Sequence, residues 1–125
     1  MLCSAAEIKP VDVGLIEQRM DGFYYLKKAK EPFEGVGVAY HEVSKDIRYR
    51  IRVEWYAKGK LDEEKTEKKQ VALLKQAEAK LGPDNLVTVL TRKYLADYYY
   101  RAGYFPKALK IYEMLVSNLE KRPHK

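Results

Sequence analysis

Two stretches that break helices constrain the fold of this chain more than any other feature. They are Gly82-Pro83-Asp84-Asn85 and Gly103-Tyr104-Phe105-Pro106. Glycine favours the position just after a helix, whereas aspartate, asparagine and proline favour its start. Around these stretches apolar residues recur at spacings of three and four, which is the period of one helical face. The sequence therefore predicts three successive helices, near residues 62–81, from 84 or 85 to 102, and from 106 onward.

Each predicted helix carries an apolar stripe that we expect to be buried. In the first helix the stripe consists of Val71, Leu74 and Leu81, with Leu73 and Ala77 beside it. In the second it consists of Val87, Leu90, Tyr94, Leu95, Tyr98 and Ala102. In the third it consists of Ala108, Leu109, Tyr112, Leu115, Val116 and Leu119. The charged run over residues 61–70 alternates in sign, which predicts a solvated face.

The chain before the helices has the periodicity of strands. Side chains alternate over residues 48–55, with Tyr49, Ile51, Val53 and Trp55 on one face and Arg48, Arg50, Arg52 and Glu54 on the other. We expect the first face to be buried in the core and the second to be exposed to solvent. Aromatic residues predict another strand near 22–27, and a third, over 36–43, leads into a hairpin loop at 44–46. Gly59 closes the last strand with a residue that can adopt positive φ.

Together these patterns predict an α+β fold in which a small antiparallel β-meander of about three strands precedes a three-helix unit. The predicted division is an N-terminal arm over residues 1–20, the meander over 21–60 and the helices over 61–125. The arm is expected to be irregular to residue 12, with a short strand or helical turn over 14–20. Either the meander covers the helices through Trp55 and nearby tyrosines, or an uncovered helical face forms a homo-oligomer.

Composition excludes several functional classes. The chain has 125 residues and is 46% hydrophobic, but no apolar run approaches the roughly 18 residues of a membrane-spanning helix. The net charge of +6 comes from 24 basic and 18 acidic residues of interspersed sign, which favours a solvated surface over a nucleic-acid stripe. The single cysteine, Cys3, excludes an internal disulfide. The compartment is left open between the cytoplasm and export after loss of a leader. Cys3 is expected in a frayed tail, with the remnant of a lipid-acceptor site as the alternative.

Catalytic chemistry is not expected from this sequence. Only His41 and His124 could act as imidazole bases, and His124 lies in the tail. His41 falls in an aromatic strand with no serine or cysteine that the sequence assigns to it, which favours a structural histidine. The acidic residues between 62 and 67 are interleaved with lysines, so we expect them to pair in solvent rather than to bind a metal. No cofactor is predicted.

Residues 21–62 resemble the MORN-type repeat of bacterial proteins often labelled antitoxins. The shared residues are Asp21, Gly22, Tyr24, Tyr25, Pro32, Phe33, Gly35, Tyr40, Tyr56, Gly59, Lys60 and Leu61. The usual Asn-Gly hairpin is replaced here by residues 43–46, and Glu63 stands where a closing glycine is usual. The resemblance implies a β-hairpin scaffold or interaction module.

Residues 92–112 resemble the tetratricopeptide repeat, in which two helices carry Leu-Gly-x2-Tyr and Ala-x3-aromatic patterns. Leu95, Ala96 and Tyr99 match the first pattern, and Ala108 with Tyr112 match the second. Both alanines are expected where two helix backbones approach closely. Arg92 and Glu120 depart from the motif. The link over residues 80–85 is similar to that of kinesin light-chain repeats.

The tetratricopeptide resemblance implies a binding surface on the outward face of the second helix. Its residues would be Lys93, Asp97, Tyr100 and Arg101. The primary hypothesis is therefore a noncatalytic protein–protein interaction or scaffold module that binds a protein or peptide. The alternative is an electrostatic nucleic-acid-binding protein that uses the strand face of Arg48, Arg50 and Arg52; interspersed charge makes nucleic acid the less favoured partner.

Overall fold

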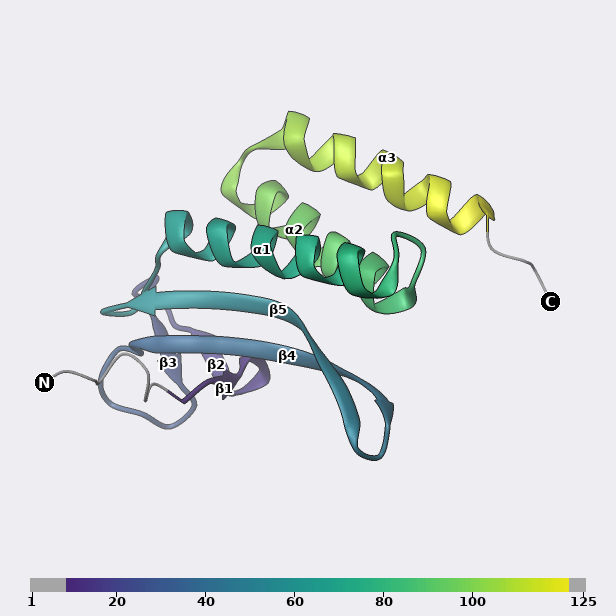
Figure 1. The fold of residues 1–125 in the computed structure, drawn as a ribbon. Coiled ribbons are helices and arrows are strands. Elements are labelled where there is room, and N and C mark those ends of the chain that lie inside the picture. Colours follow the sequence, from purple (N-terminus) through teal and green to yellow (C-terminus); the bar gives the residue numbers. More distant parts are fainter. Residues whose placement is uncertain (1–8, 122–125) are drawn as a thin grey trace, which may run out of the picture.

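The computed structural model describes residues 9–121 and has an α+β fold, as predicted. In chain order the elements are β1 (Val11–Asp12), a short 3-10 helix η2 (Val13–Leu15), β2 (Ile16–Gln18), β3 (Tyr24–Leu26), β4 (Gly35–Ser44), β5 (Ile47–Ala57), β6 (Lys60–Leu61), α1 (Glu63–Leu81), α2 (Leu86–Ala102) and α3 (Phe105–Lys121). Figure 1 shows α1 running alongside β5, with α3 on the far side of α1 and α2 from the sheet.

The helix ends follow from local capping chemistry. The Asp62 side chain accepts a hydrogen bond from the Lys65 N–H at 3.0 Å, and the Asn85 side chain accepts one from the Val87 N–H at 2.9 Å. These bonds satisfy N–H groups that have no partner within a first helical turn. Gly103 ends α2 in the left-handed conformation, with φ of 88°. The three predicted helices are confirmed, and α3 starts one residue before Pro106.

The predicted meander is wrong in its first strand. β1, β4, β5 and β6 form a mixed four-stranded sheet in that order, whereas β3 pairs with β2 in a separate two-stranded sheet. The edge of β3 that does not pair with β2 bonds two turns instead. The Phe33 N–H of the loop after β3 donates to the Tyr24 carbonyl at 2.8 Å, and the Tyr24 N–H donates to the carbonyl of Gly59, in the β5–β6 turn, at 2.7 Å. Gly59 has φ of +81°, and a Cβ there would lie 2.7 Å from Pro32 Cβ, so the contact requires glycine.

The N-terminal arm is more regular than the sequence predicts. Val11 and Asp12 pair in parallel with Gly37 and Val38 of β4, although residues up to 12 were predicted to be irregular. A two-residue strand has too few positions to show alternation, so its pattern gives no signal. Residues 1–8, which include Cys3, and residues 122–125, which include His124, lie outside the described part of the chain.

Side chains of α1 form hydrogen bonds with backbone groups along one edge of β5. The Trp55 N–H donates to Thr66 Oγ1 at 2.9 Å, and the Val53 N–H donates to Gln70 Oε1 at 2.9 Å. Gln70 Nε2 donates in turn to the Ile51 carbonyl at 2.9 Å and to the Thr91 carbonyl of α2 at 3.1 Å. Residues four apart on a helix rise about 6 Å, close to the roughly 6.6 Å between alternate strand residues. Thr66 and Gln70 can therefore substitute for a neighbouring strand.

Two apolar clusters form the core. Val36, Val38 and Val53 pack with Trp55 and Leu73, so the sheet covers α1 as one of the two sequence hypotheses expects. The second cluster, between α1, α2 and α3, contains Leu95, Tyr98, Tyr99 and Ala108. Ala96 is 0% and Ala108 2% exposed, so both small residues are buried.

Part of the predicted stripe of α3 faces outward. Leu109 is 60% and Val116 54% exposed, so the prediction that both are buried is wrong. Their spacing puts them on one helical face, but the α1–α2 pair packs against a neighbouring face that contains Ala108 and Ile111. Nothing is described of the Leu119 side chain. The described residues therefore leave an apolar strip of α3 uncovered.

A buried arginine joins the three helices. Arg92 is 3% exposed and donates to Asn118 Oδ1 of α3 at 2.7 Å and to Glu78 Oε2 of α1 at 3.1 Å. Asn118 Nδ2 donates to Asp84 Oδ1 at 2.8 Å. Arg92 therefore links α1, α2 and α3 through a charge-assisted network.

Candidate functional site

The four predicted partner-binding residues lie along one face of α2, but most of their polar atoms bond within the protein. Asp97, Tyr100 and Arg101 line a hollow of about 280 Å³ together with Arg52 and Tyr94. Lys93 lies one turn away and pairs with Asp97 at 2.8 Å. The sequence missed Tyr94 as part of this surface, although its spacing from Asp97 and Arg101 is the same helical spacing that grouped the other four.

Arg101 is held by a carboxylate of the sheet. Glu54 Oε2 accepts from Arg101 Nη2 at 2.8 Å and from Arg52 Nη2 at 2.7 Å, while Glu54 Oε1 accepts from the Tyr56 hydroxyl at 2.6 Å. Glu54 is 3% exposed, so its predicted place on a wet strand face is wrong. Burial works to raise the pKa of Glu54, but Arg52, Tyr56 and Arg101 outweigh that effect and hold it below its ordinary value. α2 packs against β5, and its Arg101 bonds Glu54, so this position of the strand is not exposed.

Asp97 is the second anchored carboxylate of this surface. Its Oδ1 accepts from the Tyr112 hydroxyl of α3 at 2.6 Å, and its Oδ2 accepts from Lys93 Nζ at 2.8 Å. Partial burial works to raise the pKa of Asp97, but the bonds from Lys93 and Tyr112 outweigh it and hold that pKa below its usual range. The same bond raises the pKa of Tyr112 to about 12. Asp97 therefore ties α2 to α3 and stays ionised near neutral pH.

We expect Tyr112→Phe to lower the free energy of unfolding by about 1 kcal/mol, because it removes one hydrogen bond to a charged acceptor and little apolar surface. It should also raise the pKa of Asp97 towards the ordinary value. Urea unfolding measures the first effect, and a carboxyl NMR titration measures the second. An unchanged Asp97 pKa would contradict the assignment of this bond. Tyr104→Phe is the matched control, because its hydroxyl makes no hydrogen bond to a carboxylate among residues 9–121.

An apolar groove of about 510 Å³ lies between α2 and α3 beside these residues. It is lined by Tyr100, Phe105, Pro106, Ala108, Leu109 and Tyr112. Tyr100 is 58% and Phe105 57% exposed, and their rings lie 5.5 Å apart edge to face. Tyr100 is the predicted site residue that belongs to both this groove and the polar hollow. The sequence predicts its exposure but not the aromatic pair, because that depends on how the turn at Gly103 places Phe105.

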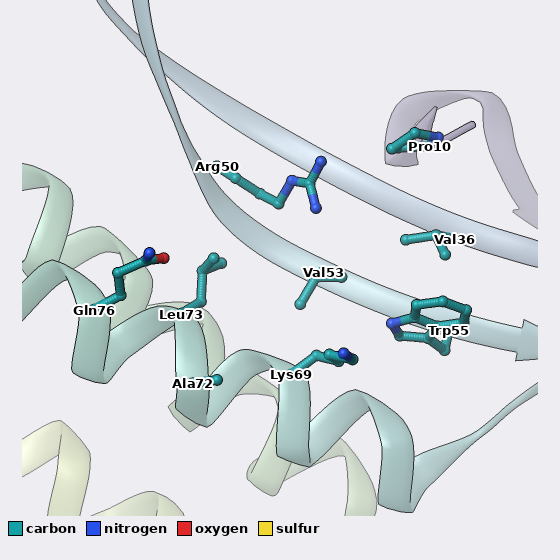
Figure 2. Close-up of a pocket in the computed structure, with 9 residues that line it drawn as sticks. All are labelled: Pro10, Val36, Arg50, Val53, Trp55, Lys69, Ala72, Leu73 and Gln76. Atoms are coloured by element: carbon teal, nitrogen blue, oxygen red, sulfur yellow. The ribbon is translucent and has the colours of Figure 1, made fainter. Parts of the chain in front are cut away.

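A larger hollow, of about 660 Å³, lies elsewhere, between α1 and the β4–β5 face. Figure 2 shows that α1 contributes Lys69, Leu73 and Gln76 to one wall and that the strands contribute Val36, Val53 and Trp55 to the other. We name it the sheet–helix groove. The sequence does not predict this surface, because its two walls lie far apart in the chain.

The predicted row of three strand arginines does not form a single surface. The β4–β5 pairing shifts register between Ala39 and Tyr40, so that Arg52 pairs with Ala39 but Arg50 with Tyr40. Such a bulge places an extra residue in β5 and interrupts the alternation of its side chains. Arg50 consequently lines the sheet–helix groove with Trp55, whereas Arg52 lines the hollow beside Tyr94 and bonds Glu54. The Arg48 guanidinium lies 4.0 Å from the Tyr40 ring centroid.

Three further findings concern His41, metal binding and membrane crossing. His41 lies opposite Tyr49 in the β4–β5 ladder. Among residues 9–121, no three His, Cys, Asp or Glu side chains are grouped closely enough to hold a metal ion. No described helix is both long and apolar enough to cross a membrane.

The chain matches no protein-family model, no curated protein and no solved structure. The resemblances to MORN-type and tetratricopeptide repeats therefore stay predictions.

Proposed function

We propose that the protein is a noncatalytic interaction module that holds an amphipathic helix of a partner protein in the groove between α2 and α3. The observation that carries this proposal is the exposure of Tyr100, Phe105 and Leu109 around one apolar groove. Adjacent antiparallel helices present ridges and grooves into which the ridge of a third helix packs. Helix-in-groove recognition uses this geometry, with affinity supplied by apolar anchors at helical spacing.

Charge selects the kind of helix that fits. The exposed strip of α3 reads Phe105, Leu109, Glu113, Val116 and Glu120 at spacings of three and four, so carboxylates alternate with the apolar anchors. A partner helix with lysine or arginine beside its apolar face complements this strip. A second copy of the chain fits less well, because a two-fold interface would place the same acidic strip on both sides.

A labelled synthetic helix provides the test. We expect an 18-residue helix of leucine and lysine to bind in a fluorescence-anisotropy titration more tightly than its leucine–glutamate counterpart. Leu109→Gln should weaken binding about tenfold, because one buried leucine contributes about 1.5 kcal/mol or more. Met114→Gln is the matched control, since Met114 is also an exposed apolar residue of α3 but does not line the groove.

Two results would contradict the proposal. One is equal binding by the Leu109→Gln and Met114→Gln variants. The other is a concentration-dependent dimer, detected by size-exclusion chromatography with light scattering, that Leu109→Gln abolishes, because the groove would then be occupied by a second copy. Circular dichroism would check that both variants fold. We expect that they do, because both positions are exposed.

A further inference from the structure

The sheet–helix groove continues along α1. A smaller section of about 160 Å³ shares Arg50, Leu73 and Gln76 with it and extends to Lys80 and Val87. Lys80 lies eleven positions after Lys69 along α1, which corresponds to about 16 Å at 1.5 Å per residue. An extended peptide of about five residues has this length. The groove is therefore long enough for a segment of chain rather than for a single side chain.

The walls of the groove carry charge of one sign. Arg50, Lys69 and Lys80 line its two sections, and within the described part of the chain no aspartate or glutamate does. This one-sidedness contrasts with the whole sequence, in which 18 acidic residues balance most of the 24 basic ones. The three cations form no salt bridge among residues 9–121, although Arg50 Nη2 donates to the Tyr40 hydroxyl at 3.5 Å. Arg52 and Arg101, by contrast, are paired with Glu54. Because no carboxylate of the groove neutralises these three cations, their positive potential would attract an anionic ligand.

The floor between these cations is apolar and contains a polar atom without a partner. Val36 and Val53 are buried there, and Leu73 packs against them. Trp55 Nε1 is buried and has no hydrogen-bond acceptor among the described residues. Figure 2 shows this nitrogen on the edge of the indole ring that is turned towards the middle of the groove. A buried donor without an acceptor costs about 1–3 kcal/mol, and a ligand carbonyl or carboxylate would recover this cost if the indole turned to expose the nitrogen.

We infer that this groove binds an extended, acidic peptide segment of a partner protein, in which aliphatic residues alternate with glutamate or aspartate. The aliphatic side chains lie on Val53 and Leu73, and the carboxylates face Arg50, Lys69 and Lys80. A single-stranded nucleic acid fits less well, because its bases would need free aromatic rings on which to stack. The Trp55 ring already has the Lys65 ammonium 4.2 Å from its centroid, and the remaining floor is mainly aliphatic.

Trp55 supplies a direct readout, because it is the only tryptophan of the chain. The probe is the blocked peptide Glu-Val-Glu-Leu-Glu-Val-Glu, compared with its glutamine counterpart. In a titration of the ¹⁵N-labelled protein, we expect the acidic peptide to shift the Trp55 indole N–H resonance in a saturable manner and the neutral peptide to bind at least fivefold more weakly. Arg50→Gln and Lys69→Gln should each weaken binding about threefold to fivefold.

Lys75→Gln is the matched control, since Lys75 lies on α1 but lines a different hollow with Glu64 and Glu67. Equal affinity for the acidic and neutral peptides, no binding of either, or tighter binding of a seven-residue oligothymidylate would each overturn the inference. The Leu109→Gln variant should bind the acidic peptide normally. Failure of this inference is thereby distinguishable from failure of the proposed function.

Discussion

Replacing Gln70 with leucine is expected to lower the free energy of unfolding by about 3 kcal/mol. Gln70 is 2% exposed, and its amide bonds the Val53 N–H, the Ile51 carbonyl and the Thr91 carbonyl. Leucine has a similar size but no hydrogen-bonding group. The variant would therefore keep the packing and leave buried backbone groups of β5 without partners, at about 1–3 kcal/mol for each group.

Urea unfolding measures this loss, and an unchanged m-value would show that the variant still folds to a comparably compact state. Gln76→Leu is the matched control, because Gln76 is exposed one and a half turns further along α1. We expect its effect to stay within about 0.5 kcal/mol. If the two variants were destabilised equally, the amide of Gln70 would not support the edge of β5.

The second large effect is expected for Glu54→Gln, which should lower the free energy of unfolding by about 2–3 kcal/mol at pH 7. The substitution keeps the shape of the side chain but removes the charge that holds Arg52, Arg101 and the Tyr56 hydroxyl. Breaking a fully buried pair costs about 3–5 kcal/mol, and the smaller figure reflects the partial exposure of both arginines.

The effect should depend on pH with a definite sign. The folded-state pKa of Glu54 lies below its ordinary value, so its stabilisation is fully present above the unfolded pKa of about 4.3 and is lost as pH falls through the lower, folded-state pKa. The difference between wild type and Glu54→Gln should consequently be constant from pH 7 to pH 5 and shrink below pH 4. Urea unfolding at pH 7, 5 and 3 tests this expectation.

Glu31→Gln serves as the control for the loss of one carboxylate, because Glu31 is exposed and forms no salt bridge in the described chain. It should unfold like the wild type at pH 7. A Glu54→Gln variant whose deficit grew on acidification would show that Glu54 is not the acid-sensitive group of this network.

The sequence predicts the helices well because their ends depend on neighbouring residues. Asp62, Asn85 and Gly103 cap through bonds that span two to four positions. Strand pairing depends on distant partners instead. On pattern alone, the strand that contains Tyr24 could pair with β4 as readily as with β2. In the structure it pairs with β2, and the backbone bonds of Tyr24 to Phe33 and Gly59 occupy its other edge.

Buried polar residues are the largest gap between the sequence and the structure. Thr66 and Gln70 fall in a charged run that predicts a solvated face, and both are buried against β5. Glu54 occupies a position of the alternating strand that predicts exposure. In each case the burial is stabilised by partners on other elements, which a local pattern does not contain.

The candidate surfaces show the same limit. The outward placement of Tyr100 follows from helical spacing, and the structure brings it beside Asp97 and Arg101 as expected. The exposure of Leu109 could not be predicted, because an apolar stripe looks identical whether the same chain or another molecule covers it. The sheet–helix groove could not be predicted either. The bulge that moves Arg50 into it is not visible in the sequence, where apolar and polar residues alternate along β5 without a break.

The side-chain bonds along β5 also affect how the newly made chain reaches this fold. The β4–β5 hairpin is synthesised before Thr66 and Gln70, and Gln70 is itself fixed by the Thr91 carbonyl of α2. Until α2 has left the ribosome, the nascent hairpin carries an open strand edge next to a cluster of valines. Open edges of this kind template aggregation. The sheet is therefore protected only after most of the chain has been made, and its folding is coupled to that of the helices.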